Sequence, residues 1–358
     1  MSFRITMDYY ILGLPTLVPE EPYKTIAYLL EGKREAYNVT RRAIDWQNIE
    51  KKAFDEEMNG VQKELAEEEN KQKNKGYDID ELNIKNIIAD LYSAMDNKAS
   101  KVASAYVNPF GYYVAGMIQE FESYNDSSLR HNARISYEKA LELNPKSEVL
   151  QEAIKDLEKQ NHPSGTKLVH VVVADGFVPE KKVLEFWLKA GSTVIPIRLP
   201  IYEPTPSKVS RIEIYSSGGK RLASLSQVAD IEAICLRHQK DMQPYYTFQV
   251  TFAAARTFSE KKMLNHLGPA GDAISDARNK MCAPDTRSWM SLPASVQAAR
   301  FYVAKGLKNI KIVTYNASGK KLASKDVDLD TSSHNFVYAR SIDNILYTYS
   351  NKKLWLAN

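Results

Sequence analysis

Apolar positions in the first 160 residues recur mostly at intervals of three and four, whereas many of those after residue 165 alternate with polar ones. The first pattern is typical of amphipathic helices and the second of half-buried strands. We therefore expect a helical domain over 1–160 and an α+β domain with a mainly antiparallel sheet over 166–358. The turn-forming run 161–165 is the predicted boundary between them.

A helical hairpin is the clearest local prediction. Asn108 can cap a helix and Pro109 fits a first helical turn, so a helix is expected to start here. The expected helices of this region cover 109–124, a stretch ending near 143, and 147–160. Ala133, Tyr137, Ala140 and Pro145 have the spacing of the second helix of a tetratricopeptide repeat, in which small residues lie where two helices meet.

The same patterns predict the remaining elements. Further helices are expected over 20–31, 33–75, 78–93, 227–240 and 244–265. Strands are expected over 167–173, 193–199, 209–216, 221–225, 301–304, 309–315, 320–327, 335–339 and 344–350. The helix over 244–265 is apolar nearly all round, so we expect it to be buried against the sheet. The strand over 221–225 should pair with the one before it.

Composition excludes some classes of protein. The net charge of +4 over 358 residues is small and evenly mixed with acids, which argues against a nucleic-acid partner. No run approaches the ~18 apolar residues of a membrane-spanning helix. The first residues lack a secretory signal, which by itself favours a cytoplasmic protein or a trimmed chain.

The sequence predicts no catalytic residue, cofactor site or metal site. Cys235 and His238 lie three residues apart on one predicted helix, but no second pair completes a metal site. His170 lies in an apolar strand and is interpreted as a core or edge residue with a satisfied hydrogen bond. Cys235 and Cys282 could form one disulfide or remain two buried thiols.

Two groups of residues are candidates for recognition. The first would line the face of the helical half that a partner binds, and it consists of Arg41, Arg42, Trp46, Tyr112 and Tyr113. The second is the segment 282–293, where an Asp285–Arg287 pair beneath Trp289 could anchor a loop or form a recognition surface.

Several segments, taken in order, resemble a known family. They are LLEGKREAYNVTRRAIDWQ, NPFGYYVAGMIQEFE, ARISYEKALELNP, GTKLVHVVVADGFVPEKK, IPIRLPIYEP and DTRSWMSLPASVQAARFYVAKG. The chain resembles an uncharacterised bacterial family of tetratricopeptide-containing envelope proteins, commonly predicted lipoproteins. Their genes often neighbour that of an outer-membrane lipoprotein that activates a penicillin-binding protein. The matching signature positions are Glu31, Arg41, Arg42, Asn108, Pro109, Phe110, Asp285, Arg287, Trp289, Leu292, Pro293 and Arg300, the last expected in the same loop as Asp285.

The resemblance implies a non-enzymatic scaffold or adaptor of the bacterial envelope that binds partner proteins through its helical half. It also implies a periplasmic, outer-membrane-associated location. One alternative is an enzyme or small-ligand binder that uses Asp285, Arg287 and His170 at an interdomain cleft on a cell-wall-related substrate. Another is a structural subunit of a large envelope assembly, which would expose a strand edge or an apolar patch.

Overall fold

The computed structural model describes residues 20–74, 82–159, 163–190, 193–204, 206–264, 284, 286 and 290–354. The helices are α2 (Glu20–Leu30), α3 (Glu35–Asn74), α4 (Ile84–Tyr92), η2 (Ser93–Met95), α5 (Asp96–Ala99), α6 (Pro109–Glu122), α7 (Leu129–Leu143), α8 (Glu148–Lys159), α9 (Ile231–Asp241) and α10 (Gln243–Leu264). The strands are β1 (Thr166–Asp175), β2 (Glu180–Ala190), β3 (Thr193–Glu203), β4 (Arg211–Ser216), β5 (Arg221–Ser224), β6 (Ser226–Asp230), β7 (Ser295–Ala304), β8 (Asn309–Tyr315), β9 (Lys321–Asp328), β10 (His334–Ile342) and β11 (Ile345–Ser350).

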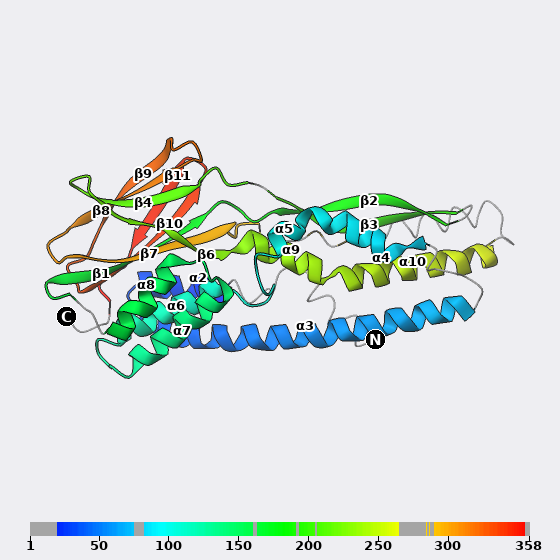
Figure 1. Cartoon of the computed structure of the whole chain (residues 1–358), viewed down its shortest axis with the longest axis horizontal. Coiled ribbons are helices and arrows are strands. Elements are labelled where there is room, and N and C mark those ends of the chain that lie inside the picture. The colour runs from blue at the N-terminus through cyan, green and yellow to red at the C-terminus, as the bar shows by residue number, and fades with distance from the viewer. Residues whose placement is uncertain are drawn as a thin grey trace.

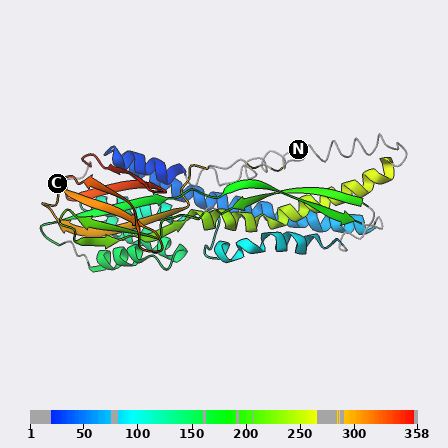
Figure 2. The same cartoon turned by 90° about the horizontal axis from the view of Figure 1, so that it is seen from above.

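These elements form an elongated molecule whose two ends consist of different helices and strands. At one end, which we call the head, α2, α6, α7 and α8 lie beside the two larger sheets (Figure 1). At the other end, which we call the arm, α10, α4 and the outer part of α3 lie beside the β2–β3 hairpin. Figure 2 shows the same long axis from above. The α+β class is confirmed.

The head contains two sheets that pack face to face. The larger one has the strand order β11-β10-β1-β7-β6, and the smaller one has the order β5-β4-β8-β9. The β1–β10 pair is parallel and the other pairs are antiparallel. The expected pairing of β5 with β4 is confirmed.

Strand β1 is buried on both faces, which explains its nearly continuous apolar sequence. Val169, Val171 and Val173 face the smaller sheet, whereas Leu168 and Val172 belong to the core shared with the helices. That core joins residues of both predicted domains, from Ile26 of α2 to Phe336 of β10. The predicted boundary near 161–165 therefore does not separate two cores.

Helix starts and ends follow local chemistry. The Asn108 side chain accepts a hydrogen bond from the Phe110 amide at 3.0 Å, so the predicted start of α6 at Pro109 is confirmed. Helix α2 ends before Gly32, whose φ is +73° and where a Cβ would clash with the Lys353 carbonyl oxygen. Glycine is required at this position for both reasons.

Three local features differ from the predictions. Residues 227–230 belong to strand β6, and helix α9 begins only at Ile231. Helix α10 does contact a sheet, through strand β3 of the hairpin, but it packs mainly on helices α3 and α4, and Phe252 is half exposed, so the helix is not buried all round. Strand β2 was not predicted, because its outward positions include the exposed apolar residues Val183 and Trp187, which obscure the alternation.

Candidate functional site

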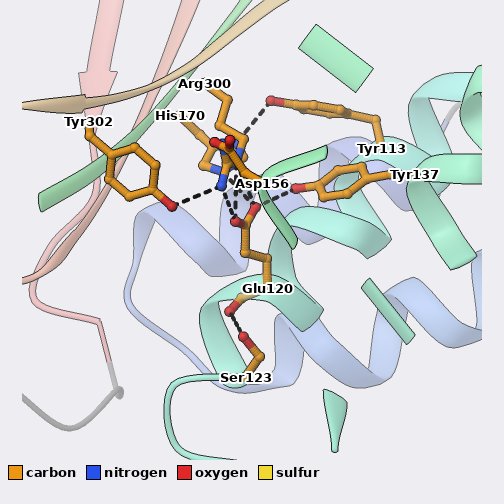
Figure 3. Close-up of polar contacts among 8 residues, drawn as sticks. All are labelled: Tyr113, Glu120, Ser123, Tyr137, Asp156, His170, Arg300 and Tyr302. Carbon is orange, nitrogen blue, oxygen red and sulfur yellow. Dashed lines mark hydrogen bonds and ion pairs between the residues drawn. The ribbon is translucent and has the colours of Figure 1, made fainter. Parts of the chain in front are cut away.

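A polar cluster lies between helix α6 and the large sheet of the head (Figure 3). His170 of β1 and Arg300 of β7 are paired directly across the two antiparallel strands. Both side chains reach Glu120, which projects from α6. Glu120, His170 and Arg300 are all buried.

Glu120 accepts four hydrogen bonds. Arg300 Nη2 donates to Oε1 at 2.6 Å, Arg300 Nε lies 3.1 Å from both carboxylate oxygens, and the Tyr137 hydroxyl of α7 donates to Oε2 at 2.9 Å. Burial alone would raise the pKa of Glu120, but the Arg300 guanidinium and these bonds hold that pKa well below its usual range. The carboxylate is therefore ionised, and its charge is balanced by Arg300.

His170 contacts two members of the cluster through its two ring nitrogens. Its Nδ1 lies 2.9 Å from the Tyr113 hydroxyl, and its Nε2 lies 3.4 Å from Glu120 Oε2. Burial lowers the pKa of His170, and the nearby Glu120 carboxylate only partly offsets this effect. In a neutral imidazole protonated on Nε2, Nδ1 accepts from the Tyr113 hydroxyl, whereas Nε2 has only the 3.4 Å contact with Glu120 and no hydrogen bond.

Arg300 also connects the sheet to a second helix. Its Nη1 donates to Asp156 of α8 at 2.7 Å, and its Nη2 donates to the Tyr302 hydroxyl at 3.0 Å. The guanidinium also lies over the Tyr302 ring, 5.2 Å from the centroid. One arginine thus joins β7, α6 and α8.

Close packing of α6 on α7 brings the Glu120 carboxylate within reach of the Tyr137 hydroxyl. A Cβ on Gly116 would lie 2.6 Å from the Tyr137 ring, so only glycine allows this ring to lie flat against α6. Ala133 and Ala140 on α7 are fully buried, as is Tyr137 between them. The close approach brings the Tyr137 hydroxyl to Glu120.

This arrangement joins secondary-structure elements and leaves its central groups inaccessible to substrate. Tyr113, Tyr137 and His170 have no exposed surface, and Glu120 is 1% exposed. The interpretation of His170 as a core residue agrees with this geometry, but only its Nδ1 has a hydrogen-bond partner. Arg300 was expected in a loop as an anchor or recognition residue; it lies instead in β7, where its main partner is a helix 180 positions earlier.

The predicted partner-binding residues do not form one surface. Tyr112 and Tyr113 are buried, 5% and 0% exposed, because both lie on faces of α6 that pack within the head. Arg42 is exposed on α3. The side chains of Arg41 and Trp46 lie outside the described residues.

The loop candidates Asp285, Arg287 and Trp289 also lie outside the described residues. The convergence of Asp285 and Arg287 with His170 therefore stays a prediction. His170 itself is enclosed by Tyr113, Glu120 and the Phe121 ring.

The Cys235–His238 pair of α9 belongs to the core. Cys235 is a free, fully buried thiol, and burial raises its pKa to about 12. His238 packs against the rings of Phe54 and Tyr106, and burial lowers its pKa to about 3. A protonated thiol and a neutral histidine in this environment do not form an activated nucleophile.

A row of exposed apolar and aromatic side chains runs along β11, the edge strand of the large sheet in the part of the chain that the structure describes. Ile345, Tyr347 and Tyr349 are 52%, 48% and 54% exposed. They lie opposite Ile342, Arg340 and Tyr338 of β10, on the face of the sheet that α2 covers only in part. Phe177, 42% exposed, extends the row, because the Arg340 guanidinium lies 4.9 Å from its ring centroid. We call Ile345, Tyr347, Tyr349, Arg340 and Phe177 the aromatic row.

A cleft of about 730 Å³ opens on the arm between α3 and the α9–α10 junction. None of the polar cluster residues lines it. Its walls carry ion pairs within single helices, such as Lys51–Asp55 on α3 and Arg237–Asp241 on α9.

The described residues contain neither a candidate metal site nor a candidate membrane span. No three histidine, cysteine, aspartate or glutamate side chains gather there in a way that could hold a metal ion. None of the helices described has both the length and the apolar character needed to cross a membrane. Comparison of the chain with protein-family models, with curated proteins and with solved structures gives no match.

Proposed function

We propose that the protein is a non-enzymatic scaffold or adaptor of the bacterial cell envelope that binds partner proteins. The aromatic row carries this proposal. Tyrosine, arginine and phenylalanine are enriched at protein–protein interfaces, where rigid aromatic side chains contribute much of the binding energy. Tyr347 and Tyr349 lie side by side on one face of an edge strand and have no covering element among the residues described.

The polar cluster supports a binding role over catalysis. Its acid, histidine and arginine are the groups from which an active site could be built, yet they bond to one another inside the head. A general acid or base must come within hydrogen-bonding reach of substrate, and enclosed side chains do not. The alternative of an enzyme at an interdomain cleft therefore depends on Asp285 and Arg287.

The helical half supplies the second element of the proposal. The close α6–α7 packing, with Ala133, Tyr137 and Ala140 at the contact, is compatible with a tetratricopeptide-like unit. Arg42 on α3 remains an accessible candidate for partner contact. The periplasmic, outer-membrane-associated location rests on the resemblance described above.

The test is an affinity pull-down from solubilised envelope membranes with the tagged full chain as bait. Tyr347→Ser/Tyr349→Ser removes the centre of the row, and Lys321→Ser/Lys325→Ser alters two exposed residues of β9 as the matched control. We expect the wild type and the control to retain the same discrete protein, and the tyrosine variant to lose it while its thermal unfolding is unchanged. Equal retention by all three chains would refute binding through the row.

A structural subunit of a large envelope assembly would use the same exposed surface. An adaptor gives a defined complex with its partner, whereas an assembly subunit gives large particles. Sedimentation of the material recovered with the wild-type bait separates these two hypotheses.

A further inference from the structure

A small pocket lies at the end of the head that faces away from the arm. Strand β1 leads into strand β2 of the arm, so the first residues of β1 lie at the opposite end of the head (Figure 1). There Thr166 is paired with Ala304 and Leu168 with His334, which brings the β7–β8 and β9–β10 connections together. The pocket has a volume of about 250 Å³ and is lined by Lys305, Asp330, Thr331, Ser332, Ser333 and Lys353. We call it the lysine pocket.

The lining of the lysine pocket favours a small and highly polar ligand. All six described lining residues carry polar or charged side chains. The volume of about 250 Å³ is also smaller than the range of about 300–1,000 Å³ that is typical of sites for drug-sized ligands. An apolar ligand would find few apolar contacts here.

The charge of the lining is positive. Asp330 is its one acid among the described residues, and that carboxylate is engaged by its own turn, where Oδ1 accepts from the Ser332 amide at 3.0 Å and from the Thr331 hydroxyl at 3.2 Å. In the described part of the chain neither Lys305 nor Lys353 has a carboxylate at ion-pair distance. The two ammonium groups are therefore available to a ligand.

A third lysine lies directly behind the pocket. Lys167 of β1 is 1% exposed, and its ammonium donates to the Asp330 carbonyl oxygen at 2.7 Å. Burial lowers the pKa of Lys167, and the Asp330 carboxylate only partly offsets this effect. A buried cation that forms no ion pair with the residues described is stabilised by an anion bound nearby.

The hydroxyl groups of the pocket differ in what they can still donate. The Thr331 hydroxyl donates to Asp330, and the Ser332 hydroxyl donates to the His334 carbonyl oxygen at 2.8 Å. The Ser333 hydroxyl has no hydrogen-bond partner among the described residues, so its proton is free for a ligand.

Two lysines and one free hydroxyl suit a phosphate better than a carboxylate. Near pH 7 a phosphate monoester carries a charge of about −1.5 to −2 and has three strong acceptor oxygens. A carboxylate has a single negative charge and two oxygens. Lysine binds phosphate as a point charge, and serine hydroxyls donate to its oxygens.

We infer that the lysine pocket binds a phosphate group through the ammonium groups of Lys305 and Lys353 and the hydroxyl of Ser333. The phosphate is either inorganic phosphate or the end of a larger molecule that carries a phosphate monoester. None of the residues of the aromatic row lines this pocket, so the inference does not depend on the proposed protein-binding function.

The test is isothermal titration calorimetry of the full chain with inorganic phosphate at constant ionic strength. Lys305→Met/Lys353→Met removes both cations of the pocket, and Lys321→Met/Lys325→Met removes two exposed lysines of β9 outside it as the matched control. The Kd for phosphate should rise by about tenfold or more with the pocket variant and by less than about twofold with the control. Ser333→Ala, which leaves both lysines in place, should raise it by about threefold.

All four lysines are exposed, so both double variants should unfold at the same temperature as the wild type in chloride. Three results would overturn the inference: no binding of phosphate to the wild type, equal weakening by the two double variants, or binding of acetate as tight as that of phosphate. Titration with glycerol 3-phosphate distinguishes the two sources. Tighter binding than that of inorganic phosphate indicates a monoester on a larger molecule, and equal or weaker binding indicates inorganic phosphate.

Discussion

Arg300 of β7 and Glu120 of α6 lie 180 positions apart in the chain, yet they form a buried ion pair at 2.6 Å. The pair and its partners come from two strands and three helices, since His170 of β1 is opposite Arg300, Tyr137 of α7 donates to Glu120, and Asp156 of α8 accepts from Arg300. It joins the helical half of the head to the sheet.

The first prediction concerns this pair. Arg300→Met leaves the Glu120 carboxylate buried without its counter-ion, so the free energy of unfolding should fall by about 3–5 kcal/mol. Arg198→Met breaks the Arg198–Glu185 pair on the outer face of the hairpin, where solvent screens the charges. Arg198→Met should lower the free energy of unfolding by less than about 1 kcal/mol. Urea unfolding of both variants measures the difference, and equal effects would show that the buried pair does not join the two halves.

A second prediction concerns two glycines in helices. At Gly116 an added Cβ would meet the Tyr137 ring at 2.6 Å, so Gly116→Ala should lower the free energy of unfolding by about 1–3 kcal/mol. At Gly60 of α3 nothing lies within 4 Å of the added atom. Gly60→Ala should raise stability by about 0.5–1 kcal/mol, because alanine favours the helix. The same sign for both variants in urea unfolding would contradict the close α6–α7 contact.

The third prediction is a loss of stability on mild acidification. Burial lowers the pKa of His238 to about 3, and the pKa of His170 is lowered as well. In the unfolded chain histidine titrates near a pKa of about 6.5, so below that pH the unfolded state binds more protons. Stability is therefore fully present above pH about 6.5 and falls as the pH drops toward the folded pKa.

His238 alone should contribute a loss of about 2 kcal/mol between pH 7 and pH 5. Glu120 acts differently: its pKa is depressed in the folded state, so its contribution persists at pH 5 and is lost only in strong acid. Urea unfolding at pH 7 and at pH 5 measures this loss of stability. Between these two pH values the free energy of unfolding of His238→Leu should fall by about 2 kcal/mol less than that of the wild type. An unchanged pH dependence in the variant would mean that His238 is not held neutral.

Local signals predicted much of the secondary structure but little of the arrangement. Asn108-Pro109 marks the start of α6 by side-chain chemistry that acts within one turn, and the alternating isoleucines of β4 and β8 all lie in the core between the two sheets. The β2 strand was missed because Trp187 and Val183 face outward where polar residues are usual. No local sequence pattern indicated that α10 and the outer part of α3 lie side by side in the arm.

The polar cluster could not be assembled from the sequence. Glu120 on the apolar side of α6 and His170 in an apolar strand were each visible as a polar residue in an apolar setting. Which residues they meet depends on the β1–β7 register and on the packing of α6 against that sheet. The predicted strand began at Phe301, the residue after Arg300. Arg300 was therefore assigned to the preceding loop.

The fourth prediction tests the proposed function most directly. A benzoylphenylalanine residue placed at Tyr349 can be cross-linked by light in the native envelope, and the same residue at the exposed Lys325 of β9 is the matched control. The expected result is one discrete protein adduct from position 349 and none from position 325. The same adducts from both positions, or none from position 349, would contradict a scaffold that binds its partner through the aromatic row.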